Sequence, residues 1–151
     1  MKSNREQVVI LMADDDEDDQ FITRRALEQS RVANDLRFVG DGVELLAYLR
    51  REGEYADPAR APRPGIVLLD LNMPRMDGRQ ALEEIKRDAD LRRIPVVVMT
   101  TSAAEEDVLR SYDLGASSYI SKPVTFERLV EVMRALGRYW IEIVHLPQEE
   151  A

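Results

Sequence analysis

Strand-like runs, most of them continuously apolar, alternate with segments of helical pattern, and this alternation constrains the fold more than any other feature. The clearest runs, residues 66–69 and 96–99, each hold four consecutive apolar residues. Runs of this kind are typical of parallel strands that are covered on both faces. The remaining strand-like runs are residues 8–12, 36–39 and 118–120.

Between these runs, apolar residues recur at helical spacing. The predicted helical stripes are Phe21, Ile22, Arg25, Ala26 and Leu27; Val43, Leu46, Ala47, Leu49 and Arg50; Leu82 and Ile85; Val108, Leu109 and Tyr112; and Leu129, Val130, Met133 and Leu136. An acidic first turn precedes the first stripe, and Thr125 is the expected N-cap of the last. We therefore expect an α/β fold of five βα units, with a five-stranded parallel sheet and helices on both faces.

The chain length of 151 residues suits a single domain. We expect this domain to span residues 1–151, with a core at about residues 8–137. Residues 52–65 contain three prolines and predict an extended loop. Residues 138–146 form an apolar C-terminal extension.

Composition excludes several classes of function. The net charge of −8 argues against direct binding of nucleic acid, which relies on basic side chains. No signal peptide or membrane-spanning stretch is evident, which predicts a cytoplasmic protein. There is no cysteine, and the single histidine, His145, lies in the tail. Hydrolases built on a Ser-His-Asp or Cys-His arrangement therefore have no support, and the lack of a glycine-rich phosphate loop argues against nucleotide binding.

Polar residues follow several of the predicted strands. Asp14 and Asp15 follow the first, Asp70 the third, Thr100 the fourth and Lys122 the fifth. In sheets of this kind, ligands bind at the carboxyl ends of the strands, and clustered carboxylates suit Mg²⁺. A purely solvated acidic loop at residues 14–19 is the alternative. Asp70, directly after four apolar residues, favours a site.

The segment Asp70-Leu71-Asn72-Met73-Pro74-Arg75-Met76-Asp77-Gly78 resembles the phosphoacceptor loop of the response-regulator receiver family. Four further features resemble that family in the same order along the chain: the acidic pair Asp14-Asp15, the hydroxyl residue Thr100, the aromatic Tyr119, and Lys122-Pro123. The resemblance covers roughly residues 8–137 and implies the (βα)5 flavodoxin-like fold of receivers.

The resemblance implies a phosphorylation-dependent signalling switch of a two-component system. Asp70 would be the nucleophile that accepts a phosphoryl group from a sensor histidine kinase. Mg²⁺ would be held by Asp15, Asp70 and the backbone carbonyl of Asn72, with Asp14 acting mostly through water. Such a protein is a phosphoacceptor that can also lose its own phosphoryl group, rather than a turnover enzyme.

Three more residues take roles from the same resemblance. Lys122 would add a positive charge beside the phosphoryl oxygens, and Thr100 would donate its hydroxyl to one of them. Movement of Thr100 would let Tyr119 turn inward and remodel the surface around the fourth helix, fifth strand and fifth helix. A half-buried strand aromatic with no such role is the alternative for Tyr119.

The proline-containing loop and the Tyr139-Trp140 tail resemble the single-domain regulators that accompany phytochrome-type kinases. We expect signalling by protein–protein contact, without nucleic acid or membrane. The apolar tail either packs back on its own domain or joins the fifth helix in a homodimer, and we expect the homodimer.

Two other classes of function remain open. The first is a Mg²⁺-dependent phosphohydrolase with an aspartyl nucleophile, although such enzymes usually carry a second acid where this chain has Asn72. The second is a pseudo-receiver, an adaptor that never takes phosphate. Such an adaptor would have no use for Asp14, Asp15, Asp70, Thr100 and Lys122 together.

Overall fold

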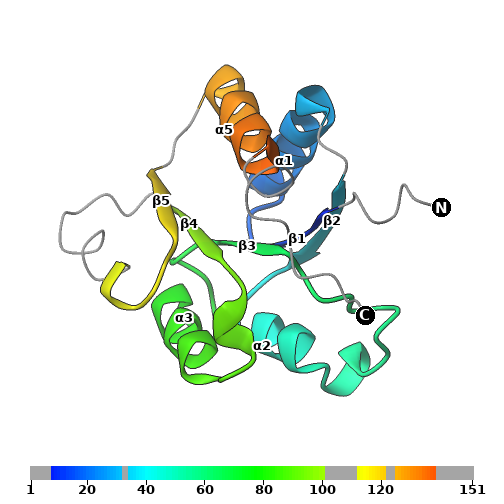
Figure 1. Cartoon of the computed structure of the whole chain (residues 1–151), viewed down its shortest axis with the longest axis vertical. Coiled ribbons are helices and arrows are strands. Elements are labelled where there is room, and N and C mark those ends of the chain that lie inside the picture. Colours follow the sequence, from blue (N-terminus) through cyan, green and yellow to red (C-terminus); the bar gives the residue numbers. More distant parts are fainter. Residues whose placement is uncertain (1–7, 32–33, 101–111, 122–124, 139–151) are drawn as a thin grey trace.

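The computed structural model describes residues 8–31, 34–100, 112–121 and 125–138. From residue 8 to residue 100, strands and helices alternate as the sequence predicts (Figure 1). The helix predicted between the last two strands falls largely on residues 101–111, outside the described residues. The strands are β1 (Val8–Ala13), β2 (Asn34–Val39), β3 (Ile66–Leu69), β4 (Val96–Thr100) and β5 (Ser118–Ser121). The helices are α1 (Glu17–Ser30), α2 (Gly42–Arg50), α3 (Gly78–Arg87) and α5 (Phe126–Arg138), with short 3-10 helices η2 (Gly53–Tyr55) and η3 (Leu91–Arg93).

The five strands form one sheet in the order β2-β1-β3-β4-β5, and every neighbouring pair is parallel. The central strand β3 is buried along its whole length. Its continuous apolar sequence is therefore explained by cover on both faces. The predicted α/β fold with a five-stranded parallel sheet is confirmed.

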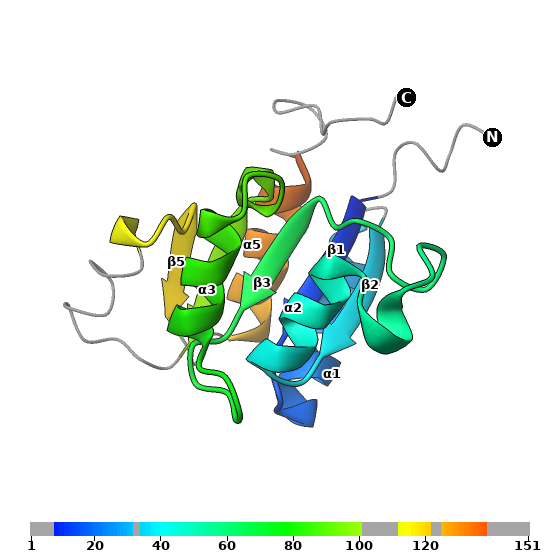
Figure 2. The same ribbon diagram turned by 90° about the horizontal axis from the view of Figure 1, so that it is seen from below.

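Helices cover both faces of the sheet. In Figure 1, α1 and α5 lie together over one face, and α2 and α3 lie over the other. Figure 2 shows α2 and α3 side by side in front of the strands. Each face has its own buried apolar cluster, one including Leu45, Leu82 and Ile85, the other Leu27 and Leu129.

Two of the predicted helical stripes are partly wrong. Phe21 and Ile22 are 60% and 40% exposed, and α1 instead buries Thr23 and Ser30 together with the predicted Ala26 and Leu27. The period was correct but its phase was not, because the face toward the sheet is set by contacts that local spacing does not specify. A buried serine is tolerated because its hydroxyl donates to the carbonyl of Leu27 at 2.8 Å.

The stripe of α2 shows the same error. Val43 is exposed, whereas Leu45 and Tyr48 are buried with the predicted Leu46. The stripes of α3 and α5 are confirmed at Leu82, Ile85, Leu129, Val130 and Met133, and Leu136 is partly buried. Val108 and Leu109 of the predicted fourth helix lie outside the described residues, and Tyr112 is exposed.

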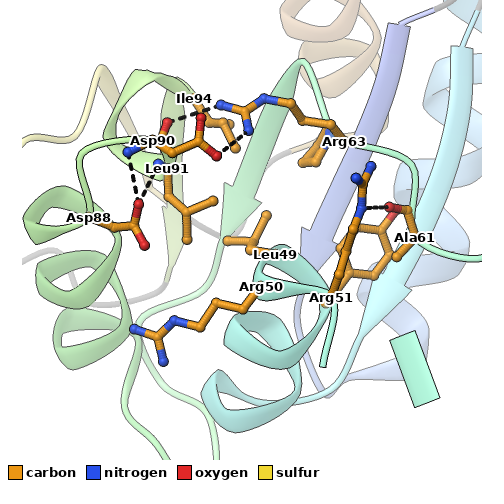
Figure 3. Close-up of a pocket in the computed structure, with 11 residues that line it drawn as sticks. Leu49, Arg50, Arg51, Ala61, Arg63, Asp88, Asp90, Leu91 and Ile94 are labelled. Atoms are coloured by element: carbon orange, nitrogen blue, oxygen red, sulfur yellow. Dashed lines mark hydrogen bonds and ion pairs between the residues drawn. The ribbon is translucent and has the colours of Figure 1, made fainter. Parts of the chain in front are cut away.

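The loop at residues 52–65 is more ordered than the sequence suggests. It contains η2 and is fastened to α2, because the Tyr48 hydroxyl donates to the carbonyl of Pro62 at 2.8 Å and the Tyr55 hydroxyl donates to Glu44 at 2.5 Å. Where this loop approaches η3, a cavity of about 350 Å³ lies at the amino ends of β3 and β4 (Figure 3). Within the described part of the chain, no helix is long and apolar enough to cross a membrane.

Candidate functional site

The carboxyl ends of β1 and β3 place two aspartates side by side. Asp14 follows β1 and donates its backbone N–H to Val39 at 3.0 Å, and Asp70 follows β3 and donates its N–H to Ala13 at 3.0 Å. Both bonds continue the pattern of the parallel sheet beyond the strand ends. The sheet itself therefore fixes the backbone positions of the two residues.

Asp14, Asp15 and Asp70 form a compact carboxylate cluster. One side-chain oxygen from each lies within 4.8 Å of the others. Asp14 is 1% exposed, Asp70 is partly buried and Asp15 is exposed. Negative charges this close repel one another, and a hard cation with oxygen ligands relieves the repulsion. The three residues fit a divalent metal in the number, type and spacing of their oxygens.

The loop after β3 is held close to Asp70. The Asp70 carboxylate accepts the backbone N–H of Asn72 at 3.0 Å, and the N–H of Gly78 donates to the carbonyl of Leu71 at 2.9 Å. We call residues 71–77 the acceptor loop. Asn72 is exposed at its beginning. Asp77 ends the loop as the N-cap of α3, accepting the N–H of Arg79 at 2.7 Å.

The remaining predicted site residues are only partly described. The backbone of Thr100 ends β4 at the same edge of the sheet, opposite Ser121 in register. Tyr119 lies in β5 opposite Val98 and is partly buried against the cluster beneath α2 and α3. Lys122 and Pro123 lie outside the described residues.

Asp16 has a structural role that the sequence analysis missed. Its carboxylate caps α1 by accepting the backbone N–H groups of Asp18 at 2.8 Å and Asp19 at 3.4 Å. Glu17, Asp18 and Asp19 fill the first turn of the helix, where negative charge is favourable. An aspartate directly before an acidic first turn was the available signal. The acidic residues 16–19 thus stabilise the beginning of α1.

Comparison with known proteins places the chain in a family. The family model of the response regulator receiver domain matches residues 10–134. The chain is a response regulator receiver. The predicted family is thereby confirmed, and the flavodoxin-like form of the sheet is that of receiver structures.

The similarity to individual receivers extends over nearly the whole chain. The response regulator Rcp1 of Synechocystis is 40% identical over 146 residues, which are 97% of each chain. The structure of the phosphorylated cyanobacterial phytochrome response regulator RcpA has a TM-score of 0.84 at 42% identity, covering 94% of this chain and 99% of that one. The Mn²⁺-bound form of Rcp1 has a TM-score of 0.81 at 40% identity, covering 93% and 99%.

These relatives define the class of function. The receiver is a phosphorylation-dependent signalling protein of the two-component type. Receivers of this family generally act in signalling rather than as turnover enzymes, and they receive phosphoryl groups from histidine kinases. A divalent metal at the carboxylate cluster agrees with the Mn²⁺-bound relative.

Proposed function

We propose that this receiver accepts its phosphoryl group on Asp70. The observation that carries the proposal is the carboxylate cluster, because it joins Asp70 to Asp14 and Asp15 within 4.8 Å at the carboxyl edge of the sheet. A side-chain oxygen of Asp70 forms the new bond to phosphorus. The bond from phosphorus to the histidine nitrogen of the kinase breaks, and the histidine ring keeps that electron pair.

The metal in this proposal is Mg²⁺. Asp15, Asp70 and the backbone carbonyl of Asn72 would hold it directly, with Asp14 acting mostly through water. When bound, Mg²⁺ neutralises part of the negative charge on the phosphoryl oxygens. The all-oxygen donor set and the exposure of Asn72 and Asp15 support this assignment.

Two further residues complete the phosphoryl site. Lys122 supplies a positive charge, and the Thr100 hydroxyl donates a hydrogen bond to a phosphoryl oxygen. The position of the Thr100 backbone at the carboxyl end of β4 supports its part. Movement of Thr100 lets Tyr119 turn further inward, and the packing of Tyr119 beside β4 is compatible with that switch.

The relatives support the proposed phosphoryl donor. The phosphoryl donor is a sensor histidine kinase of phytochrome type, which the likeness to RcpA, a phytochrome response regulator, supports.

The whole chain, residues 1–151, forms one receiver domain in the cytoplasm. It signals through protein contact and binds no nucleic acid directly, in keeping with its net charge of −8. The proposed homodimer would form through the fifth helix and the tail, whose residues 139–151 lie outside the described part of the chain.

The rate at which small phosphoryl donors are consumed distinguishes a switch from an enzyme. With acetyl phosphate in excess and Mg²⁺ present, a switch consumes one equivalent per chain rapidly and then only as fast as its own phosphoryl group is lost. p-Nitrophenyl phosphate tests for a phosphohydrolase. Steady hydrolysis of this ester, abolished by Asp70→Asn, would contradict the proposal and favour a phosphohydrolase. No consumption of acetyl phosphate at all would favour a pseudo-receiver.

A further inference from the structure

An ion pair ties the tip of the acceptor loop to the beginning of α2. The Arg75 guanidinium donates from Nε to Oδ2 of Asp41 at 2.9 Å, across 34 positions of sequence. The Arg75 side chain is 61% exposed, whereas that of Asp41 is only 13% exposed. The pair therefore joins a loop that carries a proposed metal ligand to a well-anchored carboxylate on a different element.

Arg75 holds an unfavourable backbone conformation at that tip. Its φ is +63°, in the region that favours glycine. The N–H of Met76 donates to the carbonyl of Pro74 at 2.8 Å, which closes a three-residue γ-turn around Arg75. A γ-turn with positive φ is rare and strained, and such a conformation persists only where its surroundings hold it.

Asp41 is well placed to hold the turn. It is the N-cap of α2 and accepts the backbone N–H of Glu44 at 2.8 Å. Burial raises the pKa of Asp41, but its hydrogen bonds with Glu44 and Arg75 outweigh that effect, so the pKa lies below its ordinary value. The carboxylate is thus charged at neutral pH and fixed to the helix. Beside it, a Cβ on Gly42 would be 2.5 Å from the carbonyl oxygen of Met76, so loop and helix are already in close contact.

We propose that Arg75 and Asp41 are positioning residues, which hold the acceptor loop in the shape that presents the Asn72 carbonyl to the metal. This inference rests on the proposed function. The hydrogen bond from Gly78 to Leu71 closes the base of the loop, and the ion pair fixes its tip, so Asn72 lies between two fixed points. Loss of the ion pair lets the strained turn relax, and the residues between the base and the tip of the loop then move.

The direction in which Mg²⁺ affinity changes distinguishes a positioning role from a simple effect of charge. If only the local field mattered, Arg75→Ala would remove a positive charge and tighten Mg²⁺ binding, whereas Asp41→Asn would weaken it. If the pair positions the loop, both substitutions weaken binding. Alanine keeps the Cβ of Arg75 and so its backbone preference, and asparagine is as good an N-cap as aspartate.

The experiment is a calorimetric titration of the full chain with Mg²⁺. We expect the dissociation constant to rise by roughly threefold to tenfold in both variants, at or below the low end of the 10–100-fold typical for groups that orient metal ligands. The double variant should bind no more weakly than the weaker single variant, because both substitutions break one interaction. At saturating Mg²⁺, the rate of phosphorylation by acetyl phosphate should return to near the wild-type value.

A matched ion pair provides the control. Arg63 donates to Asp90 at 2.9 Å, and like Arg75 it is an exposed arginine that links a loop to another element, but it lies at the cavity in Figure 3, at the amino ends of the strands. Arg63→Ala should leave Mg²⁺ affinity unchanged. Equal weakening in Arg63→Ala and Arg75→Ala would overturn the inference.

The outcomes also separate this inference from the proposed function. Wild-type binding of Mg²⁺ together with unchanged or tighter binding by Arg75→Ala would overturn the positioning role alone. Strictly additive losses in the double variant would do the same. A wild-type protein that binds no Mg²⁺ would overturn both the positioning role and the proposed metal site.

Discussion

Gly78 lies directly against the backbone of Asp70. A Cβ built on Gly78 would be 2.4 Å from the carbonyl oxygen of Asp70 and 2.6 Å from the Cα of Leu71. Backbone atoms cannot move aside as the end of a flexible side chain can. The first residue of α3 must therefore lack a side chain for the helix to begin so close to Asp70.

We expect Gly78→Ala to damage both stability and the site. Overpacking against backbone typically lowers the free energy of unfolding by about 1–3 kcal/mol, and the displaced Asp70 should be phosphorylated more slowly. Urea denaturation and the rate of phosphorylation by acetyl phosphate measure the two effects. Gly40→Ala is the control, because its Cβ would meet only the Glu44 side chain, at 3.6 Å. Equal behaviour of the two variants would contradict the steric argument.

Asp15 and Asp16, which directly precede α1, should differ in how much they contribute to Mg²⁺ affinity. Asp15→Asn removes a carboxylate of the cluster, so Mg²⁺ affinity should fall by at least roughly tenfold. Asp16→Asn should change affinity little, since asparagine preserves the cap of α1. Calorimetric titration with Mg²⁺ measures both. A larger loss in Asp16→Asn than in Asp15→Asn would show that the metal ligands are wrongly assigned.

Much of the fold could be predicted from local sequence. Strands covered on both faces consist of unbroken apolar runs, and β3 and β4 were predicted from such runs. The meeting of Asp14, Asp15 and Asp70 was equally predictable, since parallel strands bring their carboxyl ends to one edge. The outward position of Phe21 was not predictable, because the phase of a helical stripe depends on the surface it meets. The contact between Arg75 and Asp41 joins residues 34 positions apart and has no local signature.

Alkaline pH should destabilise the receiver through two tyrosines of the α2 region. Burial raises the pKa of Tyr48 to about 12, and burial together with the hydrogen bond to Glu44 raises the pKa of Tyr55. In the unfolded chain both hydroxyls have a pKa of about 10. Above that pH the unfolded state holds fewer protons than the folded state, so the free energy of unfolding falls as pH rises.

Urea midpoints between pH 9 and roughly 11.5 measure this effect. The fall should be less steep in Tyr55→Phe, which retains the ring but has no group to titrate. A fall of unchanged steepness in that variant would mean that Tyr55 does not contribute.

The proposed homodimer predicts a change of mass on removal of the tail. Light scattering should give twice the chain mass for the full protein, because the apolar tail would lose its cover in a monomer. A version truncated after Gly137 lacks this part of the interface and should have the mass of a single truncated chain. Circular dichroism of the truncated chain checks that it is still folded. Equal, monomeric masses for the two proteins would contradict the dimer.

Intact mass after incubation with acetyl phosphate tests the central claim most directly. The wild-type chain should gain one phosphoryl group in Mg²⁺ and none in EDTA, and Asp70→Asn should gain none in either condition. A phosphoryl adduct that persists in Asp70→Asn, or one that forms equally well in EDTA, would contradict phosphorylation of Asp70 at a metal-dependent site.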